Sequence, residues 1–470
     1  MNTLKKIVEN YLLNFNQKYM FIDKETKYTK KLILKKIEFY KEILSKNWEN
    51  KSNKGVAILL DRDIDYLCII FAAWMSDGFY LPLSLEMPKD NINYQIKDSG
   101  VSLIVLKKKG KIIFKKIRYK KNKLINKNND NIAYIIFTSG STGKKKGVCI
   151  SKSGLISYYR AIKNEFKNKR PFKSLVISGE LTFDITLADF IFALVFKTSI
   201  ALTDKSKNLL SLIDMVDTYK IEAMYLVPSA LNKLLEISNR LGKNHLLSIK
   251  HINLGGERLS PSLLLKTKKK FKNICLYNFY GPTEFTINSL CHKVVLNKNY
   301  SDVPIGKPLK GVKVYIKKDK STNNTGELYL RGEQIMLGYV NFKNTYQIIK
   351  GKKYYPTGDI VKLNKLKEFE YIGRTKEYIK LDGFRINLGR IENIILKHIK
   401  ISAKTTIIDN KIVLFIEGEL NNKKQISVKL HRIYKNYLEF YERPFQVKFL
   451  RKFSYLESGK IDVKKMMGKN

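Results

Sequence analysis

Short apolar strings alternate with longer amphipathic segments between Val56 and Tyr277, and this alternation restricts the possible folds more than any other feature of the chain. Each string is bounded by turn residues, which is typical of a buried strand, and the segments between the strings have the apolar spacing of helices. Strand–helix alternation over this length predicts an α/β fold with mostly parallel sheets. The predicted strands are Val56–Leu60, Val101–Leu106, Ala133–Phe137, Leu175–Ser178, Ala223–Val227, His251–Leu254 and Ile274–Tyr277.

The two ends of the chain depart from this pattern. Residues 5–45 have a helical pattern with one break near Asp23, and residues 300–375 contain short strands joined by tight turns, which indicates a β-rich subdomain. From Lys376 onward, a compact segment with strands of its own is long enough for a separate small domain. We therefore expect a large N-terminal domain of layered α/β subdomains over residues 1–375 and a small α+β C-terminal domain over residues 376–470. The late predicted strands are Val312–Ile316, Gly326–Leu330, Glu368–Ile372, Lys404–Ile408 and Ile412–Ile416.

No segment of the sequence predicts membrane insertion or export. The longest apolar runs, Tyr66–Met75 and Phe190–Phe196, are shorter than the ~18 residues that a spanning helix needs. The N-terminus is charged and amphipathic and has no apolar leader, so we expect a soluble, cytoplasmic protein. The cysteines at 68, 149, 275 and 291 have no paired spacing, as in reduced core or pocket residues, and the five histidines lack metal-ligand spacing.

The formal net charge of +47 (89 Lys and Arg against 42 Asp and Glu) raises the question of a nucleic-acid-binding protein. The lysines, however, occur in short runs throughout the chain and form no single tail or stripe, as at Lys107–Lys109 and Lys268–Lys270. This distribution favours a solvated surface of biased composition and argues against a dedicated nucleic-acid face. A basic surface would still attract acidic partners.

The string from Tyr134 to Val148 carries the strongest chemical signal. An apolar strand runs into Thr138-Ser139-Gly140-Ser141-Thr142-Gly143 and then into a basic cluster that includes Lys146. Glycines let backbone N–H groups approach phosphate oxygens, hydroxyls add donors, and lysine supplies positive charge. The spacing is not that of the Walker A loop, so the string predicts a phosphate-binding loop of another type.

The string resembles the phosphate loop of the adenylate-forming superfamily, which includes acyl-CoA synthetases, luciferases and the amino-acid adenylation domains of non-ribosomal peptide synthetases. Further motifs that resemble those of the superfamily follow in the same order and span residues 56–462. This resemblance implies the adenylate-forming fold, in which the small C-terminal domain is mobile. The matching segments are Asp77–Leu83, Asn278–Glu284, Gly326–Gly332 with Gly338-Tyr339, Tyr355–Asp359, Gly373–Glu392 and Ser458–Asp462.

The resemblance implies ATP and Mg²⁺ as cofactors and assigns a role to individual residues. Thr138 and the loop donors would hold the β and γ phosphates, and Glu284 would be the Mg²⁺ ligand, since Mg²⁺ prefers carboxylate oxygen. Lys460 would contact the α-phosphate and the substrate carboxylate as a point charge. We therefore expect Lys460, Thr138 and Glu284 to be the catalytic residues, with Lys376 as the hinge and Gly383 in the loop of the thioester step. The other implied nucleotide-binding residues are Ser139, Gly140, Ser141, Thr142, Gly143, Lys146, Gly256, Glu257, Asn278, Phe279, Tyr280 (stacked on adenine), Gly281, Pro282, Thr283, Asp359 (on the ribose hydroxyls) and Arg374.

The segment from Leu181 to Phe190 resembles the Phe-Asp segment of amino-acid-activating members, which implies that Asp184 pairs with the substrate α-ammonium. The alternative is that Asp184 caps a helix, because an amphipathic stretch follows it. The implied side-chain slot is uncharged, which favours a small to medium neutral amino acid. The implied substrate-binding residues are Phe183, Asp184, Ile185, Ala188, Ile252, Leu254, Phe279, Ile287 and Asn288.

The sequence ends eight residues after Asp462, so we expect a free-standing ligase similar to D-alanine–carrier protein ligases and stand-alone adenylation domains. The implied acceptor is the phosphopantetheine thiol of a separate carrier protein, which we expect to be acidic because the chain is basic. The alternatives are an acyl-CoA or aryl-CoA ligase of the same superfamily, which would not need Asp184, and a non-catalytic or nucleic-acid-binding protein, which would not need the intact motifs.

Overall fold

The computed structural model describes residues 3–23, 26–48, 53–87, 89–117, 131–138, 146–167, 171–204, 208–242, 244–318, 324–340, 346–374, 378–381, 384–409, 411–418, 423–438, 442–456 and 461–468. The chain divides into two compact units, each with its own core. The larger unit comprises Met1–Tyr315 and Tyr329–Pro356, and the smaller unit comprises Ile316–Leu328 and Thr357–Asn470. The smaller unit thus includes residues 357–375, which the sequence prediction assigns to the N-terminal domain, and the boundary at 375/376 stays a prediction.

A nine-stranded sheet forms the centre of the larger unit. Its inner strands pair in parallel, from β1 through β10, β9, β11 and β12 to β13, and antiparallel strands close both edges. In sheet order the strands are β15 (Lys307–Pro308), β14 (Leu290–Val294), β13 (Cys275–Tyr280), β12 (His251–Leu254), β11 (Ala223–Leu226), β9 (Ser174–Ile177), β10 (Ser199–Leu202), β1 (Phe21–Asp23) and β2 (Thr26–Tyr28).

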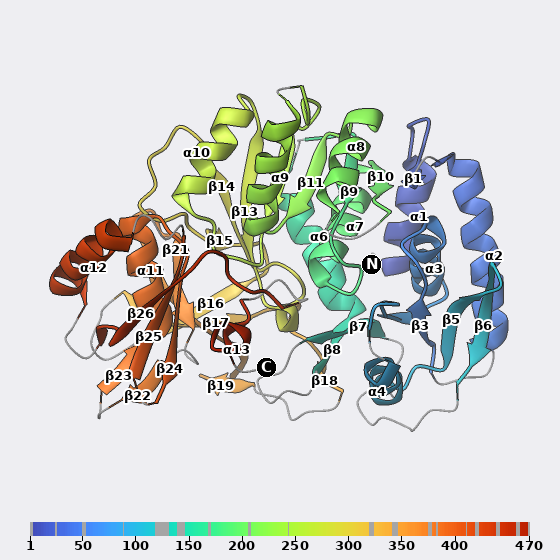
Figure 1. Ribbon diagram of the computed structural model, residues 1–470. Coiled ribbons are helices and arrows are strands. Elements are labelled where there is room, and N and C mark those ends of the chain that lie inside the picture. Colours follow the sequence, from blue (N-terminus) through green and yellow to red (C-terminus); the bar gives the residue numbers. More distant parts are fainter. Residues whose placement is uncertain are drawn as a thin grey trace. The chain divides into compact units, whose positions relative to one another are not determined.

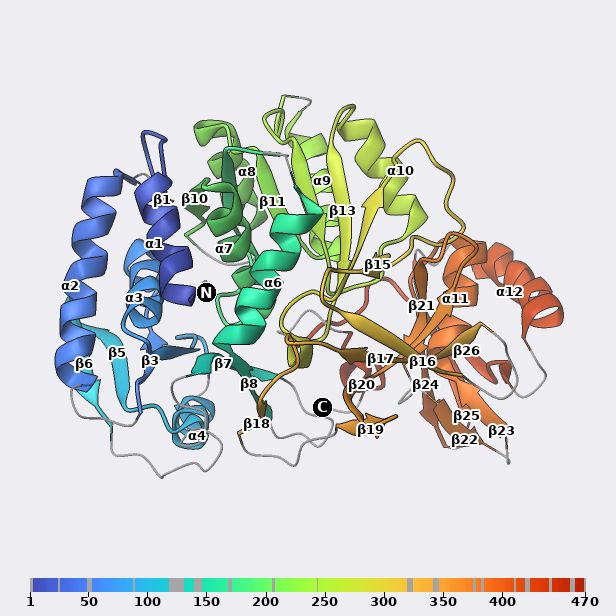
Figure 2. The same cartoon turned by 180° about the vertical axis from the view of Figure 1, so that it is seen from behind.

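Helices cover both faces of this sheet (Figures 1 and 2). Helices α8, α9 and α10 pack on one face, where Ile252, Leu254 and Leu276 meet leucines of the helices in a buried cluster. Helix α7 packs on the other face, where Phe192 lies against Phe279. The helices that cover this sheet are α6 (Lys152–Glu165), α7 (Asp184–Phe196), α8 (Leu209–Tyr219), α9 (Pro228–Leu241) and α10 (Pro261–Lys270).

A seven-stranded sheet forms the second layer system of the larger unit. Its central strands β7, β4, β3 and β5 pair in parallel, and β8 turns back antiparallel to β7. In sheet order the strands are β18 (Gly338–Tyr339), β8 (Lys146–Ser151), β7 (Ile132–Thr138), β4 (Phe79–Pro82), β3 (Gly55–Leu59), β5 (Leu103–Lys108) and β6 (Lys111–Lys116). Among its described residues, the larger unit also has the helices α1 (Leu4–Asn14), α2 (Lys30–Trp48), α3 (Ile64–Met75), α4 (Lys89–Ser99) and the short 3₁₀ helix η2 (Thr283–Phe285).

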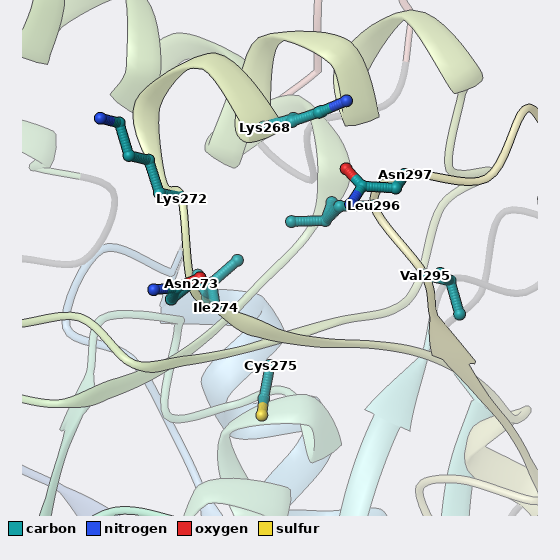
Figure 3. Close-up of a pocket in the computed structure, with 8 residues that line it drawn as sticks. All are labelled: Lys268, Lys272, Asn273, Ile274, Cys275, Val295, Leu296 and Asn297. Carbon is teal, nitrogen blue, oxygen red and sulfur yellow. The ribbon is translucent and has the colours of Figure 1, made fainter.

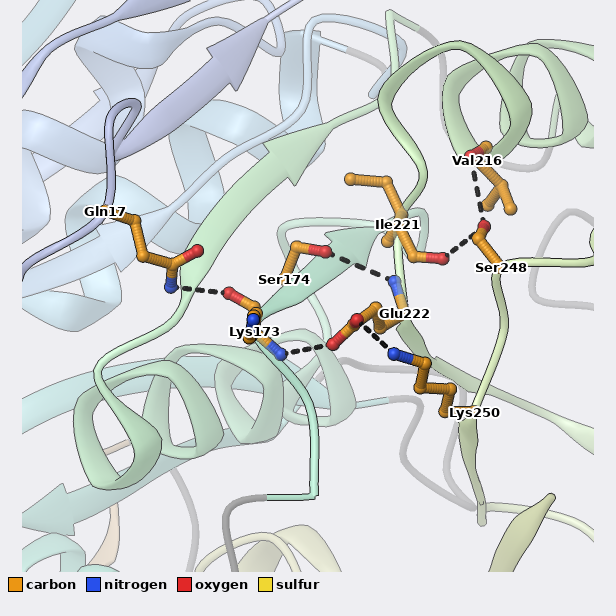
Figure 4. A network of polar contacts seen from close by, with 8 residues as sticks. All are labelled: Gln17, Lys173, Ser174, Val216, Ile221, Glu222, Ser248 and Lys250. Atoms are coloured by element: carbon orange, nitrogen blue, oxygen red, sulfur yellow. Dashed lines mark hydrogen bonds and ion pairs between the residues drawn. The ribbon is translucent and has the colours of Figure 1, made fainter.

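A polar network ties together the amino ends of β9, β11 and β12 (Figure 4). The Glu222 carboxylate accepts hydrogen bonds from the Lys173 backbone N–H at 2.6 Å and from the Lys250 Nζ at 2.5 Å. These three residues each directly precede one of the strands. The network therefore fixes the amino ends of the strands, which leaves their carboxyl ends for the loops that carry the predicted site.

The smaller unit contains an antiparallel hairpin, a three-stranded sheet and a core of its own. Helices α11 and α12 supply buried isoleucines and leucines that pack with Ile412, Leu414 and Ile416. Its elements are β22 (Tyr378–Leu381), β23 (Phe384–Asn387), α11 (Leu388–Ile399), β24 (Ala403–Ile408), β25 (Lys411–Glu417), α12 (Lys423–Tyr437), β26 (Gln446–Leu450) and α13 (Val463–Met466). A further sheet has the order β16 (Lys313–Lys318), β17 (Thr325–Arg331), β20 (Lys352–Leu363) and β19 (Gln347–Ile349), with β21 (Phe369–Arg374) paired to β20.

The α/β class with mostly parallel sheets is confirmed, and all of the strands predicted from apolar strings form within a few residues of their predicted bounds. The helical prediction for residues 5–45, with its break near Asp23, is confirmed by α1 and α2, but the break contains two short strands that were not predicted, Phe21–Asp23 and Thr26–Tyr28. The first of them pairs with Ser199–Leu202, a partner far along the chain that no local pattern reveals. Among the described residues, no helix has both the length and the apolar character to cross a membrane.

Candidate active site

The two ends of the predicted phosphate loop lie next to each other in the hairpin of β7 and β8. Thr138 is the last residue of β7 and pairs with Lys146, the first residue of β8. The Thr138 hydroxyl donates to the Lys146 carbonyl at 3.5 Å, and the Lys146 Nζ lies 5.4 Å from the centre of the Tyr339 ring. This hairpin fixes where the intervening loop begins and ends.

Glu284 lies in η2, directly after β13, and tyrosine hydroxyls surround its carboxylate. The Tyr339 hydroxyl donates to Oε1 at 2.7 Å, and the Tyr355 side chain also hydrogen-bonds to Glu284. Burial, reinforced by the nearby Glu284 charge, raises the pKa of both tyrosines, so each keeps its proton and acts as a donor. The sequence prediction includes both tyrosines in motifs but gives them no role, and their motif membership is the signal that pointed to them.

Asp184 is the first residue of α7, and its side chain is 9% exposed. The residue in the N-cap position is Phe183, which makes no side-chain cap, while the Asp184 carboxylate hydrogen-bonds to the Thr283 side chain and to the backbone of Ile185. Burial is the main cause that raises the pKa of Asp184 to about 6; the Thr283 bond opposes the rise and the Glu284 charge adds to it. Asp184 therefore supports the start of the helix and also lies beside the η2 carboxylate.

Several residues of the predicted side-chain slot are buried, and two of them, Phe279 and Asn288, both contact Tyr225. Phe279 and Ile287 are each 2% exposed, Ala188 is fully buried, and the Asn288 amide joins two tyrosine hydroxyls. These tyrosines, at positions 225 and 158, belong to no motif that we singled out, so the sequence reasoning missed them.

Ile252 and Leu254 are not part of this group. Successive side chains of a strand point to opposite faces, and these two point into the cluster formed with α8, α9 and α10. Phe279 lies on the other face, where its ring centre is 5.9 Å from that of Tyr225. Asn253 is in register with Tyr225, so it is the β12 residue on the face of the slot, and strict strand alternation in the sequence would have indicated it.

The remaining predicted residues of the larger unit follow β12 and β13. Gly256 has a φ of 80°, and the Glu257 carboxylate accepts from the Ser229 N–H and hydroxyl, each at 2.9 Å, at the start of α9. The Asn278 side chain donates to the Pro304 carbonyl at 2.8 Å, a contact within the fold. The others are Tyr280, half-buried at the end of β13; Gly281, packed against the Ile287 backbone; Pro282, which precedes η2; and Phe183, which is 45% exposed.

In the smaller unit, Asp359 and Arg374 pair across strands β20 and β21. The Arg374 Nε lies 2.8 Å from the Asp359 carboxylate, which is buried, whereas the Arg374 side chain is 52% exposed. The Thr357 hydroxyl donates to the Leu328 carbonyl at 2.8 Å, which holds this part of β20 against β17. The predicted residues Ser139, Gly140, Ser141, Thr142, Gly143, Lys376, Gly383 and Lys460 lie outside the described residues.

A hollow of about 500 Å³ opens elsewhere on the larger unit, between the end of α10 and the loop after β14 (Figure 3). It shares no residue with the predicted site. Its lining residues are Lys268, Lys272, Asn273, Ile274, Cys275, Val295, Leu296 and Asn297. Cys275 is exposed there, whereas Cys68, Cys149 and Cys291 are buried thiols.

The donor set around Glu284 fits a Mg²⁺ ion that is held partly by substrate. In the described part of the chain, no three His, Cys, Asp or Glu side chains converge as a metal cage. Mg²⁺ commonly takes one or two carboxylates and completes its shell with phosphate oxygens and water. The partly exposed Glu284 carboxylate, bonded by tyrosine hydroxyls and close to the phosphate-loop hairpin, has the chemistry that such an ion requires.

Comparisons with known proteins agree with this arrangement. The family model described as AMP-binding enzyme matches residues 42–340. Bacitracin synthase 3 of Bacillus licheniformis is 28% identical over 446 residues, which are 88% of this chain but 7% of that protein. Zwittermicin A synthase ZmaJ of Bacillus cereus is 28% identical, with 87% of this chain and 84% of that protein covered. The chain thus spans a small part of the synthases that it matches and most of the shorter relative.

Solved structures share the fold. Klebsiella oxytoca NpsA in complex with 3-hydroxyanthranilyl-AMSN matches with a TM-score of 0.82 at 16% identity, covering 100% of this chain and 99% of that one. The four-domain non-ribosomal peptide synthetase AB3403, bound to AMP and glycine, matches with a TM-score of 0.76 at 21% identity, covering 99% of this chain and 36% of that one. With the family match over residues 42–340, these findings show that the chain belongs to the AMP-binding enzyme family and is a ligase of the adenylate-forming superfamily.

Proposed function

We propose that the protein activates a neutral amino acid as its aminoacyl-AMP and transfers the aminoacyl group to the phosphopantetheine thiol of a carrier protein. The observation that carries this proposal is Asp184, a buried carboxylate held by a hydroxyl and by backbone N–H groups. The structure describes no ion pair to Asp184 from the residues that it covers. A buried carboxylate without a cation is costly, and a substrate α-ammonium would offset that cost.

In the first half-reaction, an oxygen of the amino-acid carboxylate attacks the α-phosphorus of ATP. The bond from the α-phosphorus to the bridging oxygen breaks, and pyrophosphate leaves with that oxygen. Asp184 would orient the ammonium, while Thr138 and Lys146, at the two ends of the phosphate loop, would bind the β and γ phosphates. Mg²⁺ on Glu284 would neutralise the developing phosphate charge. Bringing two anions together requires this neutralisation, and positioning supplies much of the remaining rate enhancement.

In the smaller unit, Asp359 would accept hydrogen bonds from the ribose hydroxyls, with Arg374 beside it at 2.8 Å. Lys460, whose role rests on the sequence motif, would contact the α-phosphate and the substrate carboxylate. In the second half-reaction, the carrier thiolate would attack the acyl carbon. The bond from that carbon to the phosphate oxygen would break, and AMP would leave with the oxygen and its electron pair. The synthase relatives favour a carrier-bound thiol as the acceptor.

The test is amino-acid-dependent exchange of pyrophosphate into ATP. We expect exchange with at least one neutral amino acid in a panel of L- and D-amino acids, with fatty and aryl acids included. Exchange with an aryl or fatty acid and with no amino acid would instead establish the acyl-CoA or aryl-CoA ligase alternative. Lys460→Ala should abolish exchange while ATP still binds, and unchanged exchange would refute the role of Lys460.

The acceptor is tested separately, with the purified protein, ATP, the amino acid that supports exchange and a phosphopantetheinylated carrier protein. We expect a thioester on the carrier, detected as an added mass equal to the amino acid minus water. Transfer to free coenzyme A that is at least as fast would argue against a dedicated carrier.

A further inference from the structure

We propose that the activated amino acid has a small side chain, because a hydrogen-bonded chain of Tyr158, Asn288 and Tyr225 closes the predicted side-chain slot. This inference rests on the function proposed above and narrows it from neutral amino acids in general to those of about the size of glycine, alanine or serine.

Tyr225 lies on the slot face of the nine-stranded sheet. It is in register with Asn253 on β12, which is in turn in register with Tyr277 on β13. Its ring centre is 5.9 Å from that of Phe279, a predicted slot residue. Its hydroxyl donates to the Asn288 Oδ1 at 3.0 Å, and Asn288 is another predicted slot residue. Two independent contacts therefore bring the Tyr225 ring to the slot.

Further contacts hold Asn288 in place. Its Nδ2 donates to the Tyr158 hydroxyl at 2.8 Å, and Tyr158 is fully buried on α6. The Gln334 Nε2 donates to the Asn288 backbone carbonyl at 2.9 Å. Thr286 and Ile287, which precede it, both have a left-handed backbone, with φ of 53° and 69°. Such strain persists only where the surroundings determine the conformation, and rotating the amide would leave buried polar groups unpaired.

The Tyr225 hydroxyl also reaches the backbone at the carboxyl end of β12. A Cβ atom added at Gly255 would lie 2.5 Å from this oxygen, a distance that real Cβ atoms do not show. On the neighbouring residue, a Cβ at Gly256 would lie 2.9 Å from the Ile185 Cδ1, and Ile185 is itself a predicted slot residue. The Tyr225 hydroxyl thus lies between the Asn288 amide and the β12 backbone, and these two neighbours fix the position of that end of the ring.

Asp184 belongs to the same buried region. After burial, which is the main cause, the charges of Asp189 and Asp184 are among the influences that raise the pKa of Tyr225 and of Tyr158 well above the usual value. Electrostatic influence of this kind requires proximity in the same buried region. An α-ammonium bound at Asp184 would therefore direct the substrate side chain towards the Tyr225 ring.

These contacts define how the slot would select its substrate. An aromatic ring held through its hydroxyl cannot withdraw to admit a long or branched side chain without breaking the bond to Asn288. Closely packed interiors accept extra volume only with strain. The Tyr158 hydroxyl accepts from the Asn288 amide, so we assign Tyr158 as a positioning residue that acts through Asn288.

The experiment measures kcat/KM in the exchange reaction for glycine, alanine and serine against leucine and phenylalanine. In the wild-type protein, we expect the best small amino acid to exceed both large ones by at least about 10-fold. Tyr225→Ala should reverse this preference. Tyr158→Phe should reduce the preference by about threefold, through the KM of the amino acid, with kcat and the KM of ATP unchanged.

Tyr11→Phe is the matched control. Tyr11 lies on α1, and its hydroxyl is also buried and donates to the Thr198 carbonyl at 2.9 Å. This variant should leave the size preference unchanged. A wild-type protein that prefers leucine or phenylalanine overturns the inference and leaves the proposed function intact, and this outcome does not depend on whether any variant folds. Exchange with fatty or aryl acids alone overturns both. A folded Tyr225→Ala protein with the wild-type preference also overturns the inference.

Discussion

The carboxylates of the candidate site are stabilised in different ways in the two units. In the larger unit, Glu284 is surrounded by tyrosine hydroxyls and Asp184 by the Thr283 side chain and backbone N–H groups. In the smaller unit, Asp359 is paired with the Arg374 guanidinium at 2.8 Å. Neutral donors stabilise a carboxylate without cancelling its charge, whereas a guanidinium neutralises it. The larger unit thus keeps two negative charges available for cationic ligands, and the smaller unit presents an acid whose geometry is already fixed.

This difference matches the roles that we propose for the three acids. A Mg²⁺ ion and an ammonium each require a partner with uncompensated negative charge. The two ribose hydroxyls, being neutral, require an acceptor in a fixed position, and an arginine beside the carboxylate supplies that rigidity. Substitutions that remove charge should therefore affect catalysis more in the larger unit than in the smaller one.

The largest effect is expected for Glu284→Gln. The substitution keeps the size of the side chain and an acceptor for Tyr339 but removes the charge that would hold Mg²⁺. Metal-ion stabilisation of a transition state contributes several kcal/mol, so kcat/KM for exchange should fall by about 10³-fold. Half-maximal activity should also shift to higher Mg²⁺ in a titration. Glu236→Gln, at an exposed pair with Lys266, is the control. Activity within a few-fold of wild type would contradict the metal role.

Asp184→Asn should raise the KM of the amino acid by about 10²-fold, because removing one partner of a buried, hydrogen-bonded charge pair costs 2–5 kcal/mol. The KM of ATP should change little, and the two constants are measured in the same exchange assay. Asp65→Asn is the control: Asp65 is a partly buried acid in the first turn of another helix, α3, and pairs with Lys36 at 2.6 Å. A rise of both KM values in equal measure would argue against an ammonium contact.

The pKa of Asp184 predicts how the unfolding free energy depends on pH. Burial raises this pKa to about 6, above the ordinary value of 3.8. Below the ordinary value the carboxyl is protonated in both states and contributes nothing. As pH rises towards 6, the unfolded chain releases the proton more readily, so the unfolding free energy falls, by up to about 3 kcal/mol above pH 6.

Asp184→Asn removes this dependence. The difference in unfolding free energy, variant minus wild type, should be larger at pH 7 than at pH 4 by up to about 3 kcal/mol. Denaturant titrations at both pH values measure the difference. In the wild-type enzyme, the KM of the amino acid should fall as pH rises through about 6, since the ionised form binds the ammonium. A flat profile in both experiments would show that Asp184 is ionised throughout.

The sequence predicted the layers of the fold well but predicted the slot only in part. Apolar strings locate strands because a buried strand needs apolar residues within its own segment. The pairing of Phe21–Asp23 with Ser199–Leu202, in contrast, depends on partners far apart in the chain. Motifs singled out Glu284, Asp184, Asp359 and Arg374 as candidates, and the structure brings Asp184 close to Glu284 and Asp359 close to Arg374. They did not locate Tyr158 and Tyr225, whose contribution arises only when three separate elements meet at one amide.

Arg374→Ala, in the smaller unit, should affect exchange less than the substitutions of Glu284 and Asp184. It leaves the buried Asp359 without its guanidinium, so the KM of ATP should rise by about 10-fold as the ribose acceptor loses its fixed position. The loss in unfolding free energy should be about 1 kcal/mol, because the arginine is half exposed and solvent screens the pair. Arg374→Lys should be intermediate, since it restores charge but not the planar geometry. A KM of ATP that is unchanged in both variants would remove Arg374 from the nucleotide site.

Tyr339→Phe should have the smallest effect and distinguishes charge from hydrogen bonding at Glu284. The substitution removes the 2.7 Å bond but leaves the carboxylate charge and the bond from Tyr355. A neutral hydrogen bond contributes about 1 kcal/mol, so kcat/KM for exchange should fall by about fivefold. Because Tyr339 competes with the metal for lone pairs of Glu284, half-maximal activity should shift to lower Mg²⁺, opposite to the shift in Glu284→Gln. If both variants shifted the Mg²⁺ titration in the same direction, the hydroxyl would be positioning the carboxylate for the ion and not competing with it.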